Sequence, residues 1–236
     1  MSKGGGERPA APCAPHGGLF VAGTDTGVGK TLIACALIHA LRRAGLAPMP
    51  FKPVASGCTP GRDGPVSDDT ARLIEASGQP LTQDAVSPLR YLPAIAPHIA
   101  AAESGHAIDR DRLVAQGVAL AQSGPLVVEG AGGWLVPIDA RYTLADLAVG
   151  LNLPVVLVVG LRLGCINHAL LTAEAIASRG LTLAGWVGNS IDPGFERLAE
   201  NLDTLGARLA APRLGLVPWQ PQPDARAIEI ALPVAQ

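Results

Sequence analysis

Short apolar runs alternate with longer helical patterns from Leu19 onward. Unbroken apolar runs predict buried strands, whereas apolar positions three and four apart predict helices. Strands are expected over Leu19–Gly23, Pro50–Val54, Pro125–Glu129, Pro154–Gly160, Leu183–Val187 and Arg213–Val217. Helices are expected over Lys30–Ala44, Asp69–Ser77, Asp109–Gln122, Leu144–Val149, Asn167–Arg179 and Phe195–Leu209.

The strict alternation of strand and helix predicts an α/β fold with a mainly parallel β-sheet and helices on both faces. One domain over residues 18–236 accounts for all these elements. Residues 1–17 are rich in glycine and proline and predict a flexible tail. We expect an irregular stretch over residues 80–97 and a loosely packed segment after Pro218.

Composition narrows the classes of function. The chain has 236 residues and a net charge of -2, which gives no electrostatic reason to bind nucleic acid or a membrane surface. Its apolar runs are shorter than the ~20 residues of a membrane span, and no signal-peptide core is visible. The cysteines at 13, 35, 58 and 165 are scattered, so we expect a reducing cytoplasm and a core role for Cys35.

A phosphate-binding loop lies between the first strand and the first helix. The sequence Gly23-Thr24-Asp25-Thr26-Gly27-Val28-Gly29-Lys30-Thr31 is one residue longer than the usual pattern. Its glycines bring backbone N–H groups close to phosphate, Lys30 reaches the β- and γ-phosphates, and the Thr31 hydroxyl can ligate Mg²⁺. The loop and its context predict a P-loop NTPase-like fold.

Two acids and a second lysine are candidates for the same site. Glu129 ends a strand and leads into a glycine-rich loop, where ligand sites of parallel sheets gather. Asp68 stands where a helix begins, so spacing alone leaves an N-cap and a metal ligand equally open. Lys52 ends a short strand, either as a surface lysine or as a cation facing transferred phosphate.

Three further motifs follow the loop in order: Lys52-Pro53-Val54-Ala55-Ser56-Gly57, Glu129-Gly130-Ala131-Gly132-Gly133-Trp134 and Gly164-Cys165-Ile166-Asn167-His168. With them the chain resembles the dethiobiotin synthetase family over about residues 19–219. The resemblance implies an ATP- and Mg²⁺-dependent ligase that carboxylates 7,8-diaminononanoate with CO₂ or bicarbonate. A carbamate attacks the γ-phosphate, and the second amine closes the ureido ring, giving dethiobiotin, ADP and phosphate.

The resemblance also implies roles for residues at matching positions. Lys30 and Lys52 are the catalytic lysines, and Thr31, Asp68 and Glu129 are the metal ligands. The nucleotide contacts are Gly27, Val28, Gly29, Lys30, Thr31, Leu32, Asp68, Glu129, Gly130, Ala131, Gly132, Asn189, Ser190, Pro218 and Trp219. The substrate contacts are Thr26, Lys52, Ser56, Gly132, Gly164, Cys165, Ile166 and Asn167. The last four open a helix that receives the substrate carboxylate across a homodimer interface.

Two positions depart from the family pattern, since Gly27 replaces a glutamate and Asn201 a tyrosine of some members. Two other functions are compatible with a phosphate loop. A cobyrinate-type amidoligase would carry an additional glutaminase domain, for which the chain is short. A partitioning or switch ATPase would show a basic patch or an amphipathic tail, and Asp25 stands where partitioning ATPases have a second lysine.

Overall fold

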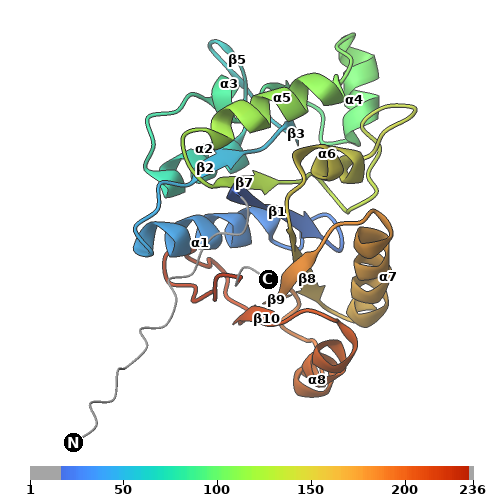
Figure 1. The fold of residues 1–236 in the computed structure, drawn as a ribbon. Coiled ribbons are helices and arrows are strands. Elements are labelled where there is room, and N and C mark those ends of the chain that lie inside the picture. The colour runs from blue at the N-terminus through green and yellow to red at the C-terminus, as the bar shows by residue number, and fades with distance from the viewer. Residues whose placement is uncertain (1–16, 234–236) are drawn as a thin grey trace, which may run out of the picture.

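A six-stranded parallel sheet forms the centre of the computed structural model, which describes residues 17–233 (Figure 1). The strands follow the order β10-β9-β8-β1-β7-β2, and every neighbouring pair runs parallel. Their bounds are β1 Gly18–Gly23, β2 Met49–Phe51, β7 Leu126–Glu129, β8 Val155–Leu161, β9 Leu183–Ser190 and β10 Arg213–Val217. Because the strands are parallel, their carboxyl ends meet at one edge of the sheet.

Helices cover both faces of this sheet, as the strand pattern requires. In β1, Leu19 and Val21 belong to one apolar core, whereas Phe20 and Ala22 belong to the other. The first core is covered by α1 (Lys30–Arg43) and α2 (Asp68–Ser77). The second is covered by α5 Arg110–Ala121, α6 Leu144–Leu151, α7 Cys165–Ser178 and α8 Leu198–Arg208. The predicted fold class is confirmed (Figure 1).

The chain leaves the central sheet at Lys52, so the prediction of one strand over Pro50–Val54 is wrong. After β2, the Lys52 N–H donates to the Val86 carbonyl at 2.9 Å, and Pro53 has no N–H to continue the ladder. β3 (Val54–Ser56) then pairs with β6 (Leu89–Tyr91) in a separate two-stranded parallel sheet. This break leaves the Lys52 side chain at the carboxyl edge of the central sheet.

The stretch predicted to be irregular, residues 80–97, is irregular only in part. It contains α3 Gln83–Val86, β6 and the start of α4 Pro97–Ser104, and a hairpin of β4 Thr59–Gly61 and β5 Gly64–Val66 precedes it. Arg90 holds these pieces together, because its guanidinium donates to the carbonyls of Pro65 (2.6 Å) and Ser87 (2.5 Å) and pairs with Asp84 (2.5 Å). Such contacts between short polar segments leave no periodic pattern in the sequence.

The sequence predicts that the two terminal segments both lack regular packing. The predicted flexible tail lies outside the described residues except for Gly17, and the domain boundary at residue 18 stays a prediction. The loose packing predicted after Pro218 is confirmed for residues 218–224, which are exposed and form no helix or strand, but it is wrong near residue 230. Ile230 is buried against the core under α1, and the Ala231 N–H donates to the Leu214 carbonyl at 2.9 Å.

None of the helices within residues 17–233 combines the length and the apolar character needed to cross a membrane.

Candidate active site

The phosphate loop connects β1 to α1 and is seated on the sheet by a buried side chain. Val28 is 1% exposed, and a Cβ added at Gly23 or Gly160 would lie within 2.8 Å of it. The two glycines therefore make the space into which Val28 fits. Gly29 precedes α1 at φ 92°, a left-handed conformation that favours glycine, and the loop then turns directly into the helix.

Asn189, near the end of β9, supports the same loop through a hydrogen bond to its backbone. Its Nδ2 donates to the Val28 carbonyl at 2.9 Å, and a Cβ at Gly29 would lie only 2.3 Å from that nitrogen. Asn189 is 6% exposed, so this hydrogen bond is made away from water. The structure thus gives Asn189 a role in shaping the loop, whereas its contact with adenine stays a prediction.

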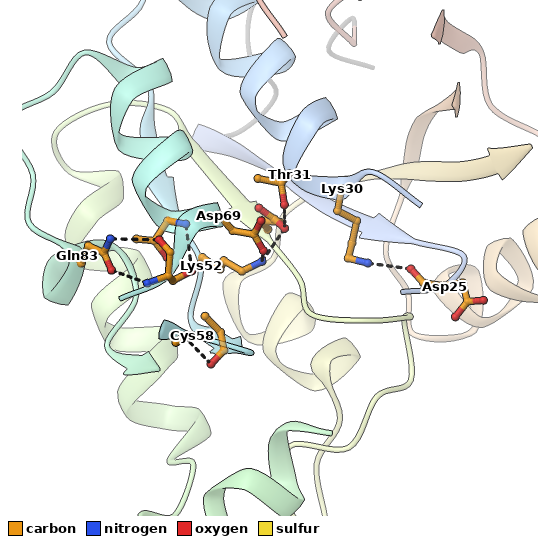
Figure 2. Close-up of polar contacts among 11 residues, drawn as sticks. Asp25, Lys30, Thr31, Lys52, Cys58, Asp69 and Gln83 are labelled. Carbon is orange, nitrogen blue, oxygen red and sulfur yellow. Dashed lines mark hydrogen bonds and ion pairs between the residues drawn. The ribbon is translucent and has the colours of Figure 1, made fainter. Parts of the chain in front are cut away.

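Lys30 is the buried cation of the loop. It is 7% exposed, and its Nζ donates to the Asp25 carbonyl at 2.8 Å (Figure 2). Asp25 is held in turn, since its carboxylate accepts from the Thr26 N–H at 2.7 Å and pairs with Arg162. Burial lowers the pKa of Lys30 to about 8, with Glu129 opposing that shift. A phosphate oxygen would offer Lys30 a charged partner in place of a carbonyl.

Lys52 lies between two carboxylates at the edge of the sheet. Its Nζ is 2.6 Å from Glu129 Oε1 and 3.2 Å from Asp69 Oδ2 (Figure 2). Burial disfavours the ammonium, but the charges of Glu129 and Asp69 outweigh burial and raise the pKa of Lys52. For Asp69, burial disfavours the carboxylate, but the charge of Lys52 outweighs burial and lowers the pKa. Lys52 and Asp69 are therefore both charged at neutral pH.

The second carboxylate of this cluster is Asp69 rather than the predicted Asp68. Ser67 is the N-cap of α2, and its hydroxyl accepts from the Thr70 N–H at 3.2 Å, so Asp68 is the first helical residue. Asp68 is exposed, and no ion pair or hydrogen bond joins its side chain to the described part of the chain. Asp69 is the second residue of α2, so its side chain points to a different side of the helix from that of Asp68 and faces Lys52.

The groups around Glu129 fit a magnesium ion. Glu129 is 1% exposed; its Oε1 accepts from the Thr31 hydroxyl at 2.8 Å, while its buried Oε2 has no hydrogen-bond partner. Within residues 17–233, no three His, Cys, Asp or Glu side chains form a metal site. Two carboxylates and a hydroxyl, completed by phosphate and water oxygens, nevertheless make the sparse oxygen set that Mg²⁺ takes beside a nucleotide.

These groups open into a cleft of about 630 Å³ between the phosphate loop and the segment before α4. Most of the predicted site residues line it. The lining comprises Thr26, Gly27, Gly29, Lys30, Thr31, Leu32, Lys52, Ser56, Asp69, Arg72, Ala94, Ile95, Ala96, Pro97, Glu129, Gly130, Ala131, Gly132 and Val136. The Ser56 hydroxyl is buried and has no hydrogen-bond partner within the described chain, so it is available to a ligand.

Some predicted residues lie outside this lining. The side chains of Val28 and Asn189 lie between the phosphate loop and the sheet. The other predicted residues outside the lining are Asp68, Ser190, Pro218, Trp219, Gly164, Cys165, Ile166 and Asn167. Gly164, at φ 93°, precedes α7, so the last four form a helix N-terminus away from the chain's own cleft. Asn201 is also elsewhere, because its amide donates to the Arg197 carbonyl at the start of α8 at 2.8 Å.

Sequence reasoning missed four parts of the lining: Asp69, Arg72, residues 94–97 and Val136. The serine at position 67 was a usable signal for Asp69. A Ser N-cap there puts residue 68 at the first helical position and residue 69 at the second. Residues 94–97 carry no such signal, because apolar residues of a loop reveal their partner surface only once the chain is folded.

Comparison with known proteins gives consistent matches. A family model described as an AAA domain matches residues 17–227. The ATP-dependent dethiobiotin synthetase BioD of Pseudomonas aeruginosa (strain UCBPP-PA14) is 55% identical over 202 residues, which cover 85% of this chain and 89% of that protein. Proteins of the same name from Aromatoleum aromaticum and Xanthomonas campestris are 52% and 47% identical, covering 84% and 89% of this chain, and 89% and 94% of their own lengths.

Solved structures resemble the chain more distantly. A ParA family ATPase from Chlorobium tepidum TLS has a TM-score of 0.47 at 16% identity, over 86% of this chain and 85% of that one. Chloroplast FtsY from Physcomitrella patens has a TM-score of 0.49 at 16% identity, over 96% of this chain and 63% of that one.

The lowered pKa of Lys30 predicts how polyphosphate binding depends on pH. Binding needs the ammonium, and the protein without ligand loses that proton as the pH rises through about 8. We therefore expect the affinity for inorganic triphosphate to fall by up to about tenfold between pH 7.5 and pH 9, with proton uptake on binding. Calorimetry at pH 8.5 in buffers of different ionisation enthalpy measures both effects. Lys30→Gln should abolish the uptake, and a flat affinity up to pH 9.5 would contradict the prediction.

Proposed function

This chain belongs to the ATP-dependent dethiobiotin synthetase family, and we propose that its phosphate-loop cleft is where the ureido ring is closed. The chain is accordingly an ATP-dependent ligase with a dethiobiotin-forming role in biotin biosynthesis. The carrying observation is the position of Lys52, a buried cation that lines the same cleft as the phosphate loop and contacts Glu129. The substrates we assign are ATP, CO₂ or bicarbonate, and 7,8-diaminononanoate, and the cytoplasm stays the expected compartment.

The phosphate loop binds ATP in this proposal. Its backbone N–H groups and the start of α1 face the phosphates, and Lys30 exchanges the Asp25 carbonyl for a phosphate oxygen. Asn189 keeps the loop in shape through Val28. The base would lie towards Ser190, Pro218 and Trp219, as the family resemblance implies.

Thr31, Asp69 and Glu129 would hold Mg²⁺. When bound, the ion neutralises charge on the phosphates and helps to align them for transfer. The free Glu129 Oε2 supports this assignment, because a buried carboxylate oxygen without a donor is costly unless a ligand completes it. Asp69 replaces the predicted Asp68 in the proposed set.

Lys52 acts on the developing charge. Because its pKa is raised, Lys52 carries its proton at neutral pH, and its side chain is buried at the inner end of the cleft. In that environment a fixed ammonium stabilises the carbamate and the γ-phosphate as charge moves between them. The reaction needs little covalent help from the protein, so holding the carbamate in line with the phosphate is the main task of the cleft.

The apolar part of the cleft lining suits the diamine. Ile95, Pro97 and Val136 offer an apolar surface for its hydrocarbon chain, and the free Ser56 hydroxyl offers a polar contact beside Lys52. Thr26 and Gly132 close the cleft on the loop side. A lining that is both apolar and polar suits an alkyl diamine and supports the substrate assignment.

The substrate carboxylate is bound by a second copy of the chain in this proposal. The helix start from Gly164 to Asn167 does not line the chain's own cleft, yet its N–H groups suit an anion. Beside it, Leu163 is 92% exposed and Leu171 on α7 is 57% exposed. Apolar side chains at this exposure favour a surface that is covered in a homodimer.

The family assignment displaces both alternatives weighed from the sequence. Neither the cobyrinate-type amidoligase nor the partitioning or switch ATPase accounts for relatives of about half identity over most of the chain that are named dethiobiotin synthetases.

Turnover of the purified protein tests the proposed function directly. With ATP, Mg²⁺, bicarbonate and 7,8-diaminononanoate, we expect one ADP per dethiobiotin by mass spectrometry and neither product when the diamine is omitted. Lys52→Ala should lose nearly all ring formation while ATP binding survives, because Lys52 stabilises the transferring charge rather than the bound nucleotide. Near-normal turnover of Lys52→Ala, or ATP hydrolysis without a ring product, would count against the proposal.

The adjacent aspartates provide a matched pair for the metal site. Asp69→Asn should lower kcat on the order of 100-fold and raise the Mg²⁺ concentration for half-maximal activity, since a ligand charge is removed. Asp68→Asn removes the same charge one position away and should stay within about twofold of the wild type. Steady-state rates across a Mg²⁺ titration compare the two variants. Equal losses in both would disprove the assignment to Asp69.

The oligomeric state tests the shared carboxylate site. We expect the protein to sediment at twice the mass of the chain, and Leu163→Asp to dissociate it because a charge is placed in the contact. That variant should lose turnover with the diamine but still bind ATP. Val118→Asp, at a residue 48% exposed on α5, is the control and should leave the dimer intact. A fully active monomer would refute the proposal.

A further inference from the structure

Arg72 lies where two hollows of the molecule meet. It lines the cleft of about 630 Å³ that holds Lys30 and Lys52. It also lines a groove of about 750 Å³ between α1, α2 and the C-terminal segment 221–226. Thr31 and Leu32, the first residues of α1 after Lys30, line both hollows as well. A chain of phosphates lying on the start of α1 would pass beside all three residues.

The charge of Arg72 has no partner among the described residues. Its helix carries an acid one turn away on either side, but Asp69 is paired with Lys52 at 3.2 Å and Glu75 with Arg226 at 2.5 Å. Asp68, also one turn away, forms no ion pair with it, and no hydrogen bond from the Arg72 guanidinium to residues 17–233 is found. The neighbouring acids that could neutralise Arg72 are thus either committed elsewhere or out of contact.

The burial pattern along α2 places Arg72 on the outer side of this helix. Leu73 and Ala76, on the inner side of α2, are 0% and 4% exposed and pack into the core with α1. Arg72 itself is exposed, on the side of α2 that faces the two hollows. Its guanidinium is close enough to Asp69 and Cys35 to influence the ionisation of both, which puts it near the start of α1.

We propose that Arg72 binds the polyphosphate of the nucleotide from the α2 side, as a cation additional to Lys30 and Lys52. This inference rests on the proposed function, since it takes ATP to lie on the phosphate loop. Arginine presents several N–H donors in a planar fork that matches phosphate oxygens, and the exposed side chain reaches them without breaking an existing contact. Arg72 then contributes to affinity for the nucleotide, whereas Lys52 acts on the transferred group.

Nucleotides of different phosphate number test this role. We expect Arg72→Gln to weaken ATP binding at least fivefold by calorimetry and to leave AMP binding within about twofold, because AMP lacks the phosphates beyond the first. Arg72→Lys, which keeps the charge, should recover part of the loss. Arg62→Gln is the control, since Arg62 is an exposed arginine in the β4–β5 turn with no ion pair in the described chain. Thermal melting confirms that each variant folds.

Steady-state kinetics separates affinity from chemistry. Arg72→Gln should raise the KM for ATP by a similar factor, with kcat and the KM for the diamine nearly unchanged. Wild-type affinity for ATP in Arg72→Gln would overturn the inference, and so would an equal loss of ATP and AMP binding, which would indicate a contact with the nucleoside. If the wild type binds ATP in an Arg72-dependent way but forms no dethiobiotin, the proposed function fails and this inference stands.

Discussion

A lysine ammonium buried against two carboxylates is the interaction on which the rest of the site depends. Lys52 and Glu129 are 4% and 1% exposed, so each charge would be costly without the other. Removing one partner of such a buried pair costs about 3–5 kcal/mol, because the remaining charge is left uncompensated. The pair therefore fixes the end of β2 against the end of β7, and Asp69 adds the start of α2 to the same point. Elements that lie far apart in the sequence are therefore held together by the ion pairs of Lys52.

The parallel sheet makes this meeting possible. With β1 between β7 and β8, and β2 beyond β7, the phosphate loop, Lys52 and Glu129 all emerge at the same edge. α1 follows the parallel strand β1 and begins at that edge, and α2 begins beside it after the β4–β5 hairpin, so the N–H groups of α1 and the carboxylate from the start of α2 face one cleft. Opposite charges are thus arranged before any ligand arrives, and the cleft needs little reorganisation when phosphate charge moves.

The segment from β3 to α4 adds what the sheet alone cannot provide. It leaves the central sheet after Lys52, and it supplies the apolar wall of the cleft at residues 94–97 and the free Ser56 hydroxyl. This segment is made of short elements, and Arg90 holds several of them through backbone carbonyls. Its structure therefore depends on side-chain contacts between segments rather than on long periodic patterns.

The sequence by itself determined the alternation of strands and helices, the phosphate loop, and the roles open to Lys52 and Glu129. Each of these follows from local information: apolar periodicity, glycine spacing, or a charged residue at a strand end. Only the tertiary structure decided that Asp69 rather than Asp68 joins Lys52, that Asn189 braces the loop through Val28, and that Arg72 has no acidic partner. These facts depend on the rotational phase of a helix and on which charges are already paired across the fold, and neither is set by residues that are neighbours in sequence.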